Sequence, residues 1–114
     1  RCDSMIQITI LLDQKKRIFG FLSENHAGFS ESGTDIICAA VSMLTINTMN
    51  AIEQFTGDDF LQEADPETAR IRFEIRGEVS KEAELLLKTM VLGLQSLEDD
   101  DNYSAYIDVV FKEV

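Results

Sequence analysis

Four residue types are scarce in this sequence. It has no tryptophan, one proline, one histidine and two cysteines in 114 residues. Two cysteines make no disulfide framework, and one thiol with one imidazole falls below the ligand count of a zinc site. We therefore expect no metal site and no cofactor.

Basic residues are also few. The chain has 10 lysines and arginines against 21 aspartates and glutamates, and its formal net charge is -11. A surface of this charge repels phosphate backbones, so we expect no direct binding to nucleic acid. The same charge attracts a basic protein or peptide, although it can equally serve solubility alone.

The length and composition are those of one globular domain. A chain of this size can bury a core without disulfides, and 45% hydrophobic with 27% charged residues is typical of soluble proteins. The longest uninterrupted apolar runs are far short of a membrane span, and no signal peptide is recognisable. We expect a cytoplasmic domain over residues 5–114 that binds no membrane. Met5 is the expected start, and residues 1–4 are expected to be leader or upstream sequence that includes Cys2.

Hydrophobic periodicity predicts five strands and two helices in the order β-β-α-β-β-α-β. The strands alternate apolar and polar residues, and the helices show a 3.6-residue period. Because most strand contacts in this order are hairpins, we predict an α+β two-layer sandwich, a mostly antiparallel sheet covered by two helices. The strands are expected over Met5–Leu12, Arg17–Ser23, Phe60–Ala64, Arg70–Arg76 and Tyr103–Val114. The helices are expected from Thr34 or Asp35 to Phe55 or Thr56, and over Lys81–Leu97 with Ser80 as cap.

Two of these elements carry further information. Gly20 inside the second strand indicates a bulge or the close approach of another segment. The first helix has an apolar stripe with apolar residues on both flanks, which predicts the central and most buried helix. The stripe comprises Ile37, Val41, Leu44, Thr48, Ile52 and Phe55, widened by Ala40 and Ala51.

The stretch Asn25–Ser42 holds the residues with the most chemical potential, His26 and Cys38. Its glycines and serines predict a loop before the helix. If Asp35 caps that helix, Cys38 falls in the first helical turn. Backbone N–H groups and the helix dipole there lower the pKa of a thiol below its free value of about 8.5.

A loop of this kind could bring His26 to Cys38. The two would then form a thiolate–imidazolium pair that attacks a carbonyl and protonates the leaving amine. Ser42, one turn beyond Cys38 on the same face, could hydrogen-bond a substrate or the sulfur, and first-turn N–H groups could hold an oxyanion. From the residues alone the alternatives stay open: an inert core cysteine, a solvated histidine, a packing serine, and glycines (Gly28, Gly33) that only shape a turn.

The same stretch of sequence resembles the signature of a known family. The motif HAG at His26, followed by Gly33 and DIICAAVS over Asp35–Ser42, resembles the signature of the ribosomal-processing cysteine protease family. The interval of twelve residues from His26 to Cys38 matches the family pattern. Asn25 stands where the family usually has glycine, and asparagine tolerates left-handed backbone better than most residues.

The resemblance implies a cysteine endopeptidase that acts through a Cys-His pair. Members of the family remove a short N-terminal extension from large-subunit ribosomal protein twenty-seven, after an aromatic pair, and they form homodimers. The loop before the helix would order over the substrate peptide, and the acidic surface would attract the basic ribosomal protein. By this carry-over Cys38 is the nucleophile, His26 the general base and acid, and Asp35, Ser42, Gly28 and Gly33 are supporting or substrate-binding residues.

Two other functions stay open on the residues. One is a non-catalytic acidic module that binds a basic ribosomal or ribosome-assembly partner, and the other is a different thiol enzyme such as an acyl transferase. Labelling of Cys38 by iodoacetamide well below pH 8 would indicate a thiolate and would argue against the binding module.

Overall fold

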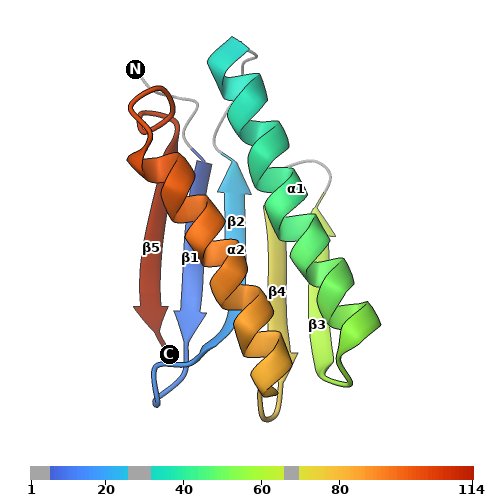
Figure 1. Ribbon diagram of the computed structural model, residues 1–114. Coiled ribbons are helices and arrows are strands. Elements are labelled where there is room, and N and C mark those ends of the chain that lie inside the picture. Colours follow the sequence, from blue (N-terminus) through green and yellow to red (C-terminus); the bar gives the residue numbers. More distant parts are fainter. Residues whose placement is uncertain (1–5, 26–31, 66–69) are drawn as a thin grey trace.

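The computed structural model describes residues 6–25, 32–65 and 70–114, which form a sheet with two helices on one of its faces (Figure 1). The predicted α+β two-layer sandwich and its element order are confirmed. The strands are β1 (Ile6–Leu12), β2 (Ile18–Asn25), β3 (Asp59–Asp65), β4 (Arg70–Arg76) and β5 (Ile107–Glu113). The helices are α1 (Ser32–Phe55) and α2 (Lys81–Asp99).

The sheet has the strand order β3-β4-β2-β1-β5. The pairs β1–β2, β2–β4 and β3–β4 are antiparallel, and β1–β5 is parallel. Among the described strands the sheet is therefore mostly antiparallel, as predicted. Strand β2 lies inside the sheet, next to both β1 and β4, so its residues are covered by neighbours on either side.

Several element ends agree with the residue patterns. Strand β4 has the predicted bounds, and α2 begins at Lys81 after the predicted cap, because the Ser80 side chain accepts a hydrogen bond of 3.0 Å from the Ala83 N–H. Two other ends were predicted wrongly. Helix α1 begins at Ser32, before the expected cap at Thr34 or Asp35. Strand β5 begins at Ile107 rather than Tyr103, because the preceding residues form turns around Asp100.

The core lies between the sheet and the two helices. Within this core the rings of Phe21 on β2 and Phe73 on the neighbouring β4 stack, with their centroids 5.6 Å apart. One face of β1, β2, β4 and β5 supplies buried residues, as the alternation predicted for β1 and β4, whereas β3 has only half-buried and exposed ones. The largest fully buried side chains are Phe21, Phe73, Ile8, Ile10, Ile37, Ile52, Leu87, Met90, Leu94, Ile107 and Thr45.

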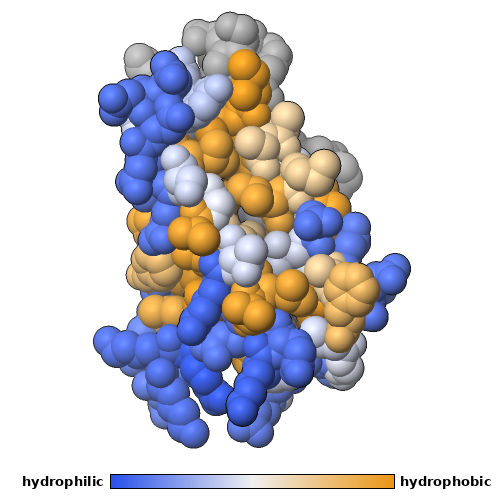
Figure 2. Space-filling view, in the orientation of Figure 1, coloured by the Kyte–Doolittle hydropathy of each residue, from blue (hydrophilic) through white to orange (hydrophobic). Residues whose placement is uncertain are grey.

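Helix α1 is less buried than its sequence predicted. Ile37, Val41 and Ile52 are buried as expected. Phe55, predicted to belong to the buried stripe, is 75% exposed, and Met43 on the apolar flank is 69% exposed. Figure 2 shows hydrophobic residues along this helical face of the molecule. Only one face of α1 reaches the sheet, so its second apolar flank has no element to pack against among the described residues of one chain.

By length and composition alone, the segment Ile36–Phe55 of α1 could cross a membrane. Uninterrupted apolar runs do not reveal this, because serine, threonine and asparagine are spread along the segment. A core helix of a globular domain meets the same criterion, and one face of α1 packs on the sheet. The property is therefore weak evidence for a membrane span.

Strand β4 passes so close to Gly20 of β2 that a larger residue does not fit at this position. A Cβ at this position would overlap the carbonyl oxygen of Phe73 on β4. The register between β1 and β2 also shifts here, since Leu11 pairs with Gly20 whereas Leu12 pairs with Ile18. The predicted bulge and close approach are both confirmed.

Candidate active site

Cys38 lies on α1, more than one full turn inside the helix. It is half-buried, packs against the core and is a thiol rather than half of a disulfide. The expected first-turn position is wrong, because α1 already begins at Ser32. In an α-helix the N–H of such a residue donates to the carbonyl four residues earlier. The Cys38 N–H is thus an intrahelical donor, and the argument from unpaired N–H groups at the helix start does not apply to it.

The missed helix start has a simple cause. Ser32, Thr34 and Asp35 are all residue types that cap helices, and Gly33 between them suggested a loop. Capping preference alone cannot choose among neighbouring candidates. Gly33 and Asp35 both lie within α1, and the structure does not describe the Asp35 side chain.

A pocket of about 510 Å³ lies beside Cys38. Helix α1 forms one wall, and strands β1, β2, β3 and β4 contribute residues to the rest of the lining. The lining residues on α1 are Cys38, Val41, Ser42 and Thr45, and those on the sheet are Ile6, Ser23, Ala64, Asp65, Arg70 and Ile71. This volume falls in the range of small-molecule and side-chain sites.

The structure brings together two of the predicted site residues. Cys38 and Ser42 both line the pocket, as their spacing of one helical turn predicted, and Ser42 is exposed. His26 and Gly28 lie outside the described residues, so the predicted His26–Cys38 pair is not placed. Strand β2, which carries one wall of the pocket, ends at Asn25, directly before His26 in the sequence.

The sequence patterns did not predict two buried polar residues that line the pocket. Thr45 is 1% exposed and Ser23 is 6% exposed. The Thr45 hydroxyl donates a hydrogen bond of 2.9 Å to the Val41 carbonyl, which satisfies it as a donor. The signal that could have revealed Ser23 is its position: it follows Phe21 by two residues, so a polar side chain occupies an inward-facing place in the strand.

Charged residues line the outer part of the pocket. Asp65 and Arg70 are exposed and pair directly across β3 and β4. The Arg70 Nε lies 3.8 Å from Oε2 of Glu24 on β2. Exposed ion pairs of this kind contribute little to stability. Within the described residues no group of three or more His, Cys, Asp or Glu could hold a metal ion.

The chain is similar to known proteins over most of its length. The model of the cysteine protease Prp family matches residues 5–108. This chain belongs to the cysteine protease Prp family. The ribosomal processing cysteine protease Prp of Bacillus subtilis (strain 168) is 30% identical over 112 residues, which cover 93% of this chain and 100% of that relative. The protein of the same description from Staphylococcus aureus (strain Mu50) is 28% identical over 98 residues, or 86% of this chain and 92% of the relative.

Solved structures of the family have the same fold. The essential ribosomal processing protease Prp from S. aureus, crystallised with a substrate peptide, has a TM-score of 0.86 and 26% identity. That comparison covers 95% of this chain and 100% of the other. A second structure of that protease, with a covalently linked product peptide, has a TM-score of 0.82 and 27% identity, with the same coverage.

Membership of the Prp family identifies the enzyme class. The chain is a cysteine protease, and the predicted family and class are confirmed. The non-catalytic acidic module and the acyl transferase, which the residue patterns left open, lose their support.

Proposed function

We propose that this enzyme removes a short N-terminal extension from a bacterial large-subunit ribosomal protein, ribosomal protein twenty-seven, after an aromatic pair. The relatives support this because they are ribosomal processing proteases, and one was crystallised with a substrate peptide. The single observation in this chain that carries the proposal is a cysteine thiol, Cys38, at the wall of a pocket large enough for an aromatic side chain.

In this proposal Cys38 is the nucleophile and His26, the only histidine, is the general base and acid. The sulfur attacks the scissile carbonyl while His26 takes the thiol proton. His26 then gives that proton to the leaving amine as the peptide C–N bond breaks, and a thioester remains. Water, activated by His26, hydrolyses the thioester and restores the thiol.

The remaining predicted residues have supporting roles in the same proposal. Ser42 lines the pocket next to Cys38, so its hydroxyl can hydrogen-bond the bound peptide. Asp35 stands three residues before Cys38 in α1, a spacing of about one helical turn, and would help to orient the catalytic pair. Gly28 precedes α1 in the sequence and Gly33 is the second residue of that helix, and both would support the binding of the peptide.

The pocket is suited to an apolar side chain next to the scissile bond. Ile6, Val41 and Ile71 give it apolar walls from three different elements. Burial of an aromatic ring against such walls is favourable by roughly 1.5–3 kcal/mol. The net charge of -11 adds long-range attraction to a basic ribosomal protein and would raise the association rate. A substrate of this kind also implies a cytoplasmic enzyme.

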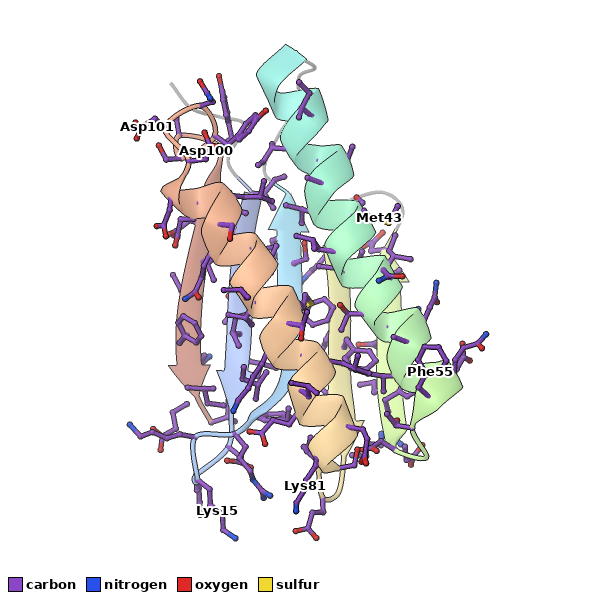
Figure 3. The ribbon with its side chains drawn as sticks, in the orientation of Figure 1. Lys15, Met43, Phe55, Lys81, Asp100 and Asp101 are labelled. Carbon is purple, nitrogen blue, oxygen red and sulfur yellow. The ribbon has the colours of Figure 1, made fainter. Side chains whose placement is uncertain are left out.

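We also propose that two copies of the chain associate through the outer face of α1. Ile36, Met43 and Ile46 are exposed there, at 54%, 69% and 44%. Together with Ala39 they follow a 3-4-3 spacing, so they share one side of the helix. Figure 3 shows Met43 and Phe55 on this helix, and Leu85 and Leu92 of the neighbouring α2 are exposed as well. A homodimer would bury this apolar surface.

The experiment is cleavage of a peptide that spans the extension and the first residues of the mature ribosomal protein. We expect the enzyme to cut after the aromatic pair and Cys38→Ala to leave the peptide intact, as followed by mass spectrometry. Cleavage by Cys38→Ala at the parent rate would overturn the assignment of the nucleophile. Tight binding of the peptide by the parent with no cleavage would overturn the proposed substrate.

A further inference from the structure

A second pocket, of about 430 Å³, shares no lining residue with the pocket beside Cys38. The first pocket lies where β1 and β4 begin, and the second lies where these two strands end, so we call it the distal pocket. It forms where the turn between β1 and β2 meets the end of β4 and the segment before α2. Figure 3 shows Lys15 of that turn and Lys81 of α2 at this end of the molecule, and Asp100 and Asp101 at the other.

Three lining residues of the distal pocket are apolar and belong to the core or pack against it. Ile75 and Val79 are 5% and 8% exposed, and Phe19 is half-buried. Walls of this kind favour an apolar group, because its burial removes apolar surface from water. Gly77 lines the pocket as well, and a Cβ there would meet no atom within 4 Å, so the pocket is open on this side.

The charged residues of the distal pocket are Asp13, Lys15 and Arg17. The Asp13 carboxylate is used within the turn: it accepts hydrogen bonds from the N–H groups of Lys15 and Arg17 at 2.8 Å and 2.9 Å, and from Nε of Arg17 at 3.2 Å. A guanidinium has five N–H donors, and within the described residues only Nε of Arg17 has a partner. The exposed Lys15 ammonium has no ion-pair partner among those residues. The pocket is therefore cationic at its mouth, with donors left for an anion.

This combination selects a ligand that carries an apolar group next to a carboxylate. A cation would be repelled by Lys15 and Arg17, and a purely apolar ligand would leave both cations unpaired. The last residue of a peptide carries both groups on one Cα atom, and capture of a C-terminal carboxylate is a recurring mode of peptide recognition. The preceding residues of such a peptide would leave the pocket on the open side at Gly77.

We propose that the distal pocket binds the C-terminal residue of a second peptide chain whose last side chain is apolar. That side chain lies against Phe19, Ile75 and Val79, and the α-carboxylate accepts hydrogen bonds from Lys15 and Arg17. This binding is separate from cleavage at Cys38, because the two pockets have no residue in common.

The test is a titration of the isotope-labelled parent with the peptide Ala-Ala-Ala-Leu, in which the amide NMR shifts report where the peptide binds. We expect saturable shifts at Phe19 and Gly77 and none at Val41 and Ser42 of the first pocket. The same peptide with a C-terminal amide lacks the carboxylate charge and should bind about tenfold more weakly. Isocaproate, which has the leucine side chain and a carboxylate but no peptide chain, should also bind more weakly than the peptide.

Lys15→Gln removes one cation from the mouth of the pocket and should raise the Kd of the peptide about fivefold. The matched control is Lys81→Gln, the same change of charge at an exposed residue of the same end of the molecule, outside the pocket. Its Kd should stay within about twofold of the parent, because salt screens a charge that makes no contact.

The opposite results would each overturn the proposal. Absence of saturable shifts at Phe19 and Gly77 would mean that the distal pocket does not bind the peptide, and equal binding of acid and amide would exclude recognition of the carboxylate. Equal binding of isocaproate would replace the peptide by a small carboxylate. Equal weakening in Lys15→Gln and Lys81→Gln would show that only the overall charge acts. Cleavage of the extension peptide at Cys38 is measured separately, and its success or failure leaves this test unchanged.

Discussion

Ser23 of β2 and Cys38 of α1 line the same pocket from opposite layers of the sandwich. The helix contributes the sulfur, and the strand contributes a buried hydroxyl that has no hydrogen-bond partner in the described part of the chain. The thiol and the facing wall of the pocket thus come from different elements, which a substitution can address one at a time. A change at Cys38 should affect cleavage of every peptide, whereas a change at Ser23 should leave the nucleophile in place.

Replacement of Cys38 by alanine should abolish cleavage with little loss of stability. Loss of a nucleophile commonly lowers kcat by about a thousandfold or more. Because Cys38 is only half-buried, we expect a cost in the free energy of unfolding of about 1 kcal/mol. Peptide cleavage and thermal unfolding measure the two effects. Cys2→Ala is the control, since it removes the other thiol of the chain and should leave the rate of cleavage unchanged.

Replacement of Ser23 by alanine should leave the protein as stable as the parent or stabilise it by up to about 1 kcal/mol. The substitution removes a buried hydroxyl that has no partner in the described structure. Ser80→Ala makes the same chemical change at a hydroxyl that caps α2, and should destabilise by about 1 kcal/mol. Urea unfolding of both variants tests this. A loss of stability in Ser23→Ala equal to that in Ser80→Ala would show that the Ser23 hydroxyl is bonded.

Gly20→Ala should be strongly destabilising. The new Cβ would overlap the Phe73 carbonyl, and backbone atoms of a neighbouring strand cannot move aside as a side chain can. We expect a loss of about 2–3 kcal/mol in the free energy of unfolding. The matched control is Gly57→Ala, where a Cβ would meet no atom within 4 Å, and a change of less than about 1 kcal/mol is expected. Equal effects at the two glycines would contradict the close approach of β2 and β4.

Asp58 should make stability depend on acid pH. Burial raises the pKa of Asp58, but hydrogen bonds from Ser80 and Thr56 outweigh it and hold the pKa below its ordinary value of 3.8. The Ser80 N–H donates a hydrogen bond of 2.8 Å to Oδ2 of Asp58. This bond connects the start of α2 to the segment before β3. A group whose folded pKa is depressed stabilises the fold above its unfolded pKa.

The contribution of Asp58 should thus be complete above about pH 5 and should disappear as the pH falls through the lowered pKa. Unfolding of the parent and of Asp58→Asn, measured from pH 7 down to pH 2.5, should show a difference that is constant near neutrality and shrinks in acid. A difference that stays constant over the whole range would mean that the carboxylate charge of Asp58 adds nothing.

Met43→Lys should weaken the proposed dimer without unfolding the chain. The Met43 side chain is 69% exposed, so a charge there costs little in one chain but would be buried between two. Gln14→Lys adds the same charge in an exposed turn at the far end of the sheet and serves as control. Light scattering should report a lower mass for Met43→Lys alone. Equal masses for the parent and both variants would place any interface elsewhere.

The sequence by itself determined the kind and order of the elements. Periods of 2 and 3.6 residues separate strands from helices because each element buries one face. They predicted β4 residue for residue, and Ser80 marked the start of α2 through its capping side chain. The family was likewise evident from a short motif around Cys38. Each of these signals is local, because it depends only on residues that are close together in the sequence.

The tertiary structure alone decided where the site lies and what lines it. Three residues able to cap α1 follow within four positions, so local preference could not set its start. The exposed flank of α1 looked like core because periodicity reports that a face is apolar but not whether another element covers it. Ser23 joined Cys38 only because β2 lies inside the sheet, between β1 and β4, with α1 above it. The two residues belong to different layers of the sandwich, so only the packing of the helix on the sheet brings them to one pocket.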